Sequence, residues 1–121
     1  MNNTTTYPIL YSLRNCPYAM RARLAIFKAK QTVLLRDLVL SDKPAEMMAV
    51  SPKGTVPVVV LKNGTVIEES LGVMLWALNE TDPADLLHCQ QEHALPAMLL
   101  LISEFDNDFK TCLEAYKCAK R

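Results

Sequence analysis

The order of apolar runs and amphipathic stretches along this chain predicts an α/β fold. A strand, a helix and a second strand come first, and a crossover through a helix joins parallel strands. Two further apolar runs flank Asn63-Gly64, a pair that favours the tight turn of an antiparallel hairpin. The sequence therefore predicts a mixed four-stranded sheet in the order β-α-β-α-β-β-α, with helices on its faces.

The individual elements are predicted from residue spacing and from turn residues. β-branched and aromatic runs indicate strands, whereas apolar residues three and four positions apart indicate one face of a helix. Met20, Leu24 and Phe27 form such a stripe after Pro17, a residue that suits the first turn of a helix. The expected strands lie within residues 8–12, 32–35, 58–61 and 65–67, and the expected helices begin at 17, cover 45–48 and 71–79, and continue as 96–104 and 109–117.

Polar stretches set the predicted ends of these helices. Ser41-Asp42 and Ser70 are expected to be N-caps, and Asp106-Asn107-Asp108 is expected to separate the last two helices. No strand is expected beyond residue 80. We therefore expect residues 1–80 to form one domain, and residues 81–121 to supply a linker and the first helices of an incomplete all-α domain.

Composition excludes several classes of function. Thirteen Lys and Arg residues balance thirteen Asp and Glu residues, so no field that attracts nucleic acid or a membrane surface is expected. The longest apolar run, residues 94–102, is too short to span a bilayer. The spacing of the four cysteines matches neither a zinc motif nor a Cys-x-x-Cys pair. We therefore expect no metal site, and a reducing, cytoplasmic location.

Cys16 is the candidate catalytic residue. It is expected between the first strand and the first helix, at the helix N-terminus. There the free backbone N–H groups and the positive end of the helix dipole stabilise an anion, and the thiolate is the reactive form of cysteine. Arg14, two residues away, adds a positive charge. The alternative is a small buried residue, which is what an isolated cysteine commonly is.

Four short motifs carry a resemblance to a known family, and they occur in the family's order and spacing over about residues 8 to 80. They are LYSLRNCPYA at 10–19, DKPAE at 42–46, GTVPV at 54–58 and IEES at 67–70. With these motifs the chain resembles the thioredoxin-like half of glutathione transferases. It looks most like the cysteine-type branch, which comprises the omega class and its bacterial relatives.

The resemblance implies a catalytic role for Cys16, which would form a mixed disulfide with glutathione or activate it. Ala19 stands where glutaredoxins often carry a second cysteine, so the implied route uses one thiol, with glutathione as co-substrate and a small electrophile or disulfide as the other substrate. Tyr18 would line the site, although it could equally be a core residue. Tyr11 is interpreted as structural, because Cys16-Pro17 matches the cysteine branch. The alternative function is a non-catalytic module that binds glutathione or a protein.

The resemblance also assigns the glutathione site. Val56, before a Pro57 that is cis in the family, would pair its backbone with the cysteinyl part of glutathione. Glu69 would attract the ammonium of the γ-glutamyl end, and Ser70 with the helix N-terminus would bind its carboxylate, a role that a helix N-terminus suits on its own. Lys43 would face the glycyl carboxylate. Each residue also has an ordinary interpretation: an edge proline, a solvated carboxylate, an N-cap or a surface lysine.

The apolar stretch at residues 94–102 requires a partner surface. A solvated helix carries far fewer apolar side chains, and leaving several hundred Å² of such surface in water forfeits several kcal/mol at about 25 cal/mol per Å². We therefore expect a homodimer that buries the helix at residues 95–105, with a mobile stretch as the alternative.

Overall fold

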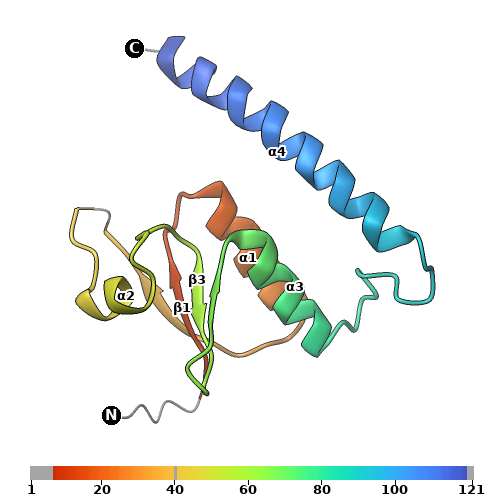
Figure 1. Cartoon of the computed structure of the whole chain (residues 1–121), viewed down its shortest axis with the longest axis horizontal. Helices are drawn as coiled ribbons and strands as arrows, with labels where there is room; N and C mark the ends of the chain where they lie inside the picture. Colours follow the sequence, from red (N-terminus) through yellow and green to blue (C-terminus); the bar gives the residue numbers. More distant parts are fainter. Residues whose placement is uncertain (1–6, 40, 120–121) are drawn as a thin grey trace. The chain divides into compact units, whose positions relative to one another are not determined.

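The computed structural model of the chain describes residues 7–39 and 41–119 (Figure 1). These residues form two compact units that divide after Ala84. None of the helices in the described ranges combines the length and the apolarity that a bilayer crossing requires.

The first unit is built on a four-stranded sheet with the strand order β2-β1-β3-β4. β1 pairs with β2 in parallel, and β3 runs antiparallel to both β1 and β4. The predicted α/β fold with a mixed sheet in the order β-α-β-α-β-β-α is therefore confirmed. Its elements are β1 (Ile9–Ser12), α1 (Pro17–Lys28), β2 (Leu34–Asp37), α2 (Ala45–Val50), β3 (Val58–Val60), β4 (Val66–Glu68) and α3 (Ser70–Glu80).

Helices cover both faces of this sheet. α1 and α3 pack together on one face, and α2 lies on the other (Figure 1). Met47 of α2 is fully buried in a cluster with Tyr11, Leu38 and Val58. Successive side chains of a strand point to opposite faces of the sheet. Leu10, next to Tyr11, and Val59, next to Val58, are also buried, so they face the α1–α3 layer.

α1 buries a different face from the one its apolar stripe predicts. Met20, Leu24 and Phe27 are 46%, 62% and 74% exposed, so this apolar stripe predicts the helix correctly but does not face the core. The buried face instead carries small residues and Ile26, namely Ala19, Ala22, Ala25, Ile26 and Ala29. Small side chains let two helices approach closely, and α3 contributes the buried Val73 and Ala77 to this packing.

Two of the predicted N-caps are wrong. Pro44 is the N-cap of α2, whereas Asp42 pairs with Val39 in an isolated bridge ahead of that helix. α3 begins at Ser70 itself, and its N-cap is Glu69 with a φ of 71°. Ser70 is therefore the first residue inside the helix, where its hydroxyl is available to other groups.

The second unit contains one long helix, α4 (Ala94–Ala119), where two helices were expected. Asp106-Asn107-Asp108 does not break it, because Asp and Asn cost a helix interior only about 0.7 kcal/mol each, far less than proline. No Gly or Pro follows Pro96 within the helix. Pro96 itself lies in the first turn, where a missing N–H leaves no intrahelical bond unmade.

The core between α2 and the sheet gives a test of this packing. Met47→Ala removes a fully buried side chain and should lower the free energy of unfolding by about 2–5 kcal/mol, measured by urea denaturation. Met48→Ala is the matched control on the same helix, because Met48 is 36% exposed, and it should cost about 0.5 kcal/mol. Equal losses from the two variants would contradict the orientation of α2.

Candidate functional site

Cys16 lies where β1 has ended and α1 begins. It is the N-cap of α1, with an extended backbone (φ −88°, ψ 120°), and Pro17 occupies the first helical position. Its carbonyl oxygen accepts the first helical bond from the Met20 amide at 2.8 Å. The first turn contains no acidic residue, so no carboxylate there offsets the positive end of the helix dipole. Backbone N–H groups at the start of a helix favour an anion in general.

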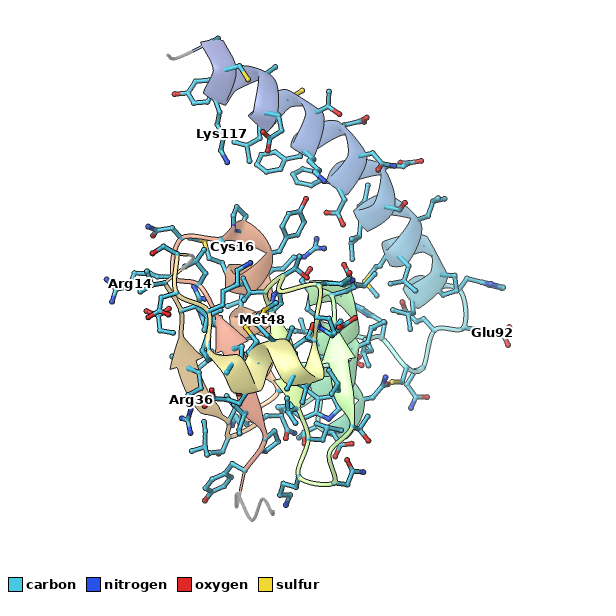
Figure 2. The ribbon with its side chains drawn as sticks, turned by 60° about the vertical axis from the view of Figure 1, so that its left-hand side comes forward. Arg14, Cys16, Arg36, Met48, Glu92 and Lys117 are labelled. Carbon is cyan, nitrogen blue, oxygen red and sulfur yellow. The ribbon has the colours of Figure 1, made fainter. Side chains whose placement is uncertain are left out.

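The loop that carries Cys16 is held by a side chain from the helix that follows it. Arg23 donates through Nη1 to Ser12 Oγ and to the Leu13 carbonyl oxygen at 3.2 Å, and through Nη2 to the Arg14 carbonyl oxygen at 3.0 Å. The Arg14 side chain is exposed and points outward from the loop, whereas Cys16 sits at the start of α1 (Figure 2). The arginine that organises this loop is therefore Arg23, which sequence reasoning assigned to no role.

The N-terminus of α3 lies beside that of α1. Arg21 Nε of α1 donates to Ser70 Oγ at 2.9 Å, and just beyond the ends of both helices Gln31 Nε2 donates to Thr81 Oγ1 at 2.9 Å. Contacts at both ends show that α1 and α3 run parallel. The two positive helix ends therefore point the same way, with Cys16 at one of them and Ser70 at the other.

Arg21 joins two of the predicted site residues. Its guanidinium carbon lies 5.2 Å from the ring centroid of Tyr18, and its Nε bonds Ser70, whose side chain is 5% exposed. Tyr18 is half-buried and lies in the first turn of α1, two positions after Cys16. A positive charge thus sits between Tyr18 and the α3 N-terminus, which adds to the attraction of that end for an anion.

Glu69 already holds an ammonium group. Its Oε2 lies 2.6 Å from Lys53 Nζ, and this hydrogen bond raises the pKa of Lys53 above its usual value. Glu68 Oε1 lies 3.7 Å from the same nitrogen, while Glu68 Oε2 accepts a 2.6 Å bond from the fully buried Ser51. Sequence reasoning missed Lys53 and Ser51, since nothing in the spacing indicates that the loop before β3 meets the end of β4.

Lys43 lies beside Gly54, which is in the turn that precedes Val56–Pro57 and β3. The Val56–Pro57 peptide bond is cis, as the resemblance implies. Gly54, two residues earlier, has a φ of 68°, and a Cβ placed on it would lie 3.1 Å from Lys43 Nζ. Lys43 is half-buried rather than fully exposed. A side chain at position 54 would therefore meet the Lys43 ammonium as well as backbone strain.

Tyr11 belongs to the core and not to this edge of the molecule. It is 4% exposed and packs with Leu38, Met47 and Val58. Burial raises the pKa of its phenol above the ordinary value, so the neutral form is favoured. A phenol in that setting is suited to packing rather than to activating a thiol.

Comparison with known proteins identifies the first unit. The family model "Glutathione S-transferase, N-terminal domain" matches residues 10–85. A protein named probable glutathione transferase from Aplysia californica is 45% identical over 58 residues, which make up 48% of this chain and 62% of that relative.

Solved structures share the fold. A glutathione S-transferase from Methylobacillus flagellatus, crystallised with glutathione bound, superposes with a TM-score of 0.79 at 22% identity over 94% of this chain and 56% of its own. A glutathione transferase homologue from Sulfitobacter with bound glutathione gives a TM-score of 0.72 at 17% identity over 84% and 49%. This chain spans less than two thirds of each relative. Because the family model matches more than half of its residues, the chain belongs to the glutathione S-transferase family and contains the N-terminal domain of that family.

Proposed function

We propose that this chain is a glutathione-dependent thiol transferase of the cysteine-type, omega-like or bacterial branch of its family. One observation carries the proposal: Cys16 is the N-cap of α1, beside a first turn with no acidic residue. Ala19 supplies no second thiol one turn later, so the route uses a single cysteine. A cytoplasmic location suits four cysteines that are all free.

The reaction proceeds in two exchanges. The Cys16 thiolate attacks the glutathione sulfur of a mixed disulfide, the S–S bond breaks, and the other thiol leaves as a thiolate that takes a proton from water. A second glutathione, as its thiolate, then attacks the glutathione sulfur bound to Cys16. This step releases glutathione disulfide and restores the Cys16 thiolate, so the electrons balance without another reductant. A small electrophile could replace the disulfide in the first step.

Glutathione is proposed to bind at the starts of α1 and α3. Ser70, with the α3 N-terminus, binds the γ-glutamyl carboxylate, and Arg21 supports this role because it places a cation on the same hydroxyl. Glu69 takes the ligand's ammonium, a role that its contact with Lys53 Nζ supports. The remaining proposed contacts are the Val56 backbone before Pro57 for the cysteinyl part, Lys43 for the glycyl carboxylate and Tyr18 as a wall.

The proposed domain boundary lies four residues before the division of the two units, which comes after Ala84. We propose that residues 1–80 form the glutathione-binding domain and that residues 81–121 form a linker and the beginning of a helical domain. The competing function is a non-catalytic module that binds glutathione or a protein.

The reactivity of Cys16 distinguishes the two functions. We expect iodoacetamide at pH 7 to label Cys16 faster than the exposed Cys89, Cys112 and Cys118. Peptide mass spectrometry measures the labelling of each cysteine. Exposure alone predicts the opposite order, because Cys16 is the least accessible of the four. Cys16→Ser should abolish glutathione-disulfide exchange, with Cys112→Ser as the control. Labelling that follows exposure, with no exchange activity, would leave only the binding module.

Glutathione affinity tests the placement of the γ-glutamyl end. Glu69→Gln removes the charge that attracts the ammonium, and Ser70→Ala removes a hydroxyl but keeps the helix N–H groups. Each should weaken binding by about 0.5–2 kcal/mol in calorimetric titration. Glu80→Gln, at the other end of α3, is the matched control and should bind as the unmodified chain does. Unchanged affinity in both site variants would mean that glutathione binds elsewhere.

We also propose that the chain self-associates through α4. Because α4 is one long helix, the apolar surface it offers extends beyond the predicted residues 95–105. α4 buries none of its described side chains, and the Phe105 and Phe109 rings stack with their centroids 5.3 Å apart. Apolar residues recur in alternating steps of three and four, as in a coiled-coil seam. The seam consists of Leu95, Met98, Ile102, Phe105, Phe109, Cys112 and Tyr116.

A dilution series followed by light scattering tests this seam. The chain should be a two-fold dimer at high micromolar concentration, because each buried aromatic side chain removes about 150–250 Å² from water. Phe105→Asp should convert it to a monomer, whereas Thr111→Asp, which adds the same charge off the seam, should leave the dimer intact. A monomeric, folded chain at high micromolar concentration would disprove the proposal.

A further inference from the structure

A single side chain, Arg23, bonds three consecutive residues of the segment that leads to Cys16. Its two terminal nitrogens reach Ser12 Oγ, the Leu13 carbonyl oxygen at 3.2 Å and the Arg14 carbonyl oxygen at 3.0 Å. Ser12 is 1% exposed, and Arg23 is half-buried. The guanidinium is thus held against this segment: its bonds to Ser12 and Leu13 are partly buried, and its bond to Arg14 is exposed.

The position of Arg23 on α1 explains how this contact arises. Side chains of a helix point back toward its N-terminus, and Arg23 lies in the second turn, so its long stem runs toward the loop that precedes the same helix. Its planar guanidinium presents five N–H donors in a fixed arrangement and can serve several acceptors at once. A lysine ammonium at the same position is a compact charge that cannot span three acceptors.

Arg23 and the backbone amide of Cys16 share one acceptor. The Leu13 carbonyl oxygen receives both Arg23 Nη1 at 3.2 Å and the backbone amide of Cys16 at 3.2 Å. The turn from Leu13 to Cys16 is therefore closed by the same oxygen that the guanidinium holds. The three acceptors are all uncharged, so the positive charge of Arg23 is not neutralised by any of them.

We propose that Arg23 is a positioning residue that holds the turn before α1 and thereby keeps the Cys16 sulfur at the helix N-terminus. The inference rests on the proposed catalytic role of Cys16, but it concerns the geometry of the thiol rather than any contact with glutathione. A displacement of about 1 Å at a reacting group can reduce a rate by about 100-fold.

The test compares Arg23→Met, Arg23→Lys and the control Lys28→Met, which makes the same change at the far end of α1. The rate of Cys16 alkylation by iodoacetamide is measured from pH 5 to 9, with the exposed Cys89 in the same molecule as internal standard. Arg23→Met should slow Cys16 by about tenfold to 100-fold relative to Cys89. Arg23→Lys should recover only part of this loss, because lysine restores the positive charge but not the planar set of N–H donors.

Amide hydrogen exchange supplies the structural readout. The Cys16 amide should exchange faster in Arg23→Met, while amides in the middle of α3 should be unchanged. If Arg23→Met does not fold, Ser12→Ala removes one acceptor only and should give a smaller change in the same direction in both measurements. An unchanged Cys16 rate and amide exchange in these variants would overturn the inference, as would full recovery in Arg23→Lys.

The outcome is independent of whether the proposed function is correct. Neither alkylation nor hydrogen exchange requires glutathione. A chain that lacks glutathione-disulfide exchange, but whose Cys16 rate falls in Arg23→Met, would refute the thiol transferase and leave the positioning role intact. A chain that catalyses glutathione-disulfide exchange, but whose Cys16 alkylation rate is unchanged in Arg23→Met, would support the thiol transferase and refute the positioning role.

Discussion

The close packing of α1 on α3 is the constraint on which the candidate site depends. Alanines on the buried face of α1 let the two helices lie side by side, and the bonds from Arg21 to Ser70 and from Gln31 to Thr81 hold them in parallel. Parallel helices place both positive dipole ends at the same end of the layer. Because β1 leads into α1 and β4 leads into α3 at that end, the chain delivers Cys16 and Ser70 there by topology alone. A bulkier interface would separate the helices and with them the two groups.

The charges around these helix ends are divided in a way that suits a zwitterion. Arg21 and the α3 N-terminus make the vicinity of Ser70 positive, whereas Glu68 and Glu69 make the adjoining edge negative. Lys53 now balances that negative edge, but both Lys53 and Glu69 are exposed, and exposed ion pairs contribute little to stability. A ligand ammonium could therefore share or take over Glu69 without a large loss. An amino acid-like end, with its ammonium and carboxylate a short distance apart, matches this pattern.

The sequence was sufficient for the order of elements but not for their tertiary contacts. Strand runs, the Asn63-Gly64 turn and the helix-start proline Pro17 are local signals, and each led to the observed element. The buried face of α1 could not be read from hydrophobicity, because the strongly apolar Met20, Leu24 and Phe27 are exposed and the buried residues are mostly alanines. The long α4 was missed because three polar residues resemble a break that only Gly or Pro would enforce. Arg21, Arg23 and Lys53 were missed because spacing identifies a polar helix face or loop without showing which side chain reaches another segment.

The same packing bears on why the proposed route needs only one thiol. Ala19, at the position where a second cysteine would provide an internal resolving group, is fully buried on the alanine face of α1. The side chain at that position therefore serves the contact between α1 and the core, and a sulfur there would have to fit where a methyl group now fills the space. Cys16, one turn earlier, is the N-cap and not a buried residue of the helix, and Arg23 bonds the turn that precedes it. Position 19 therefore serves packing, and position 16 serves the proposed chemistry. The second thiol must then come from a separate molecule, such as glutathione.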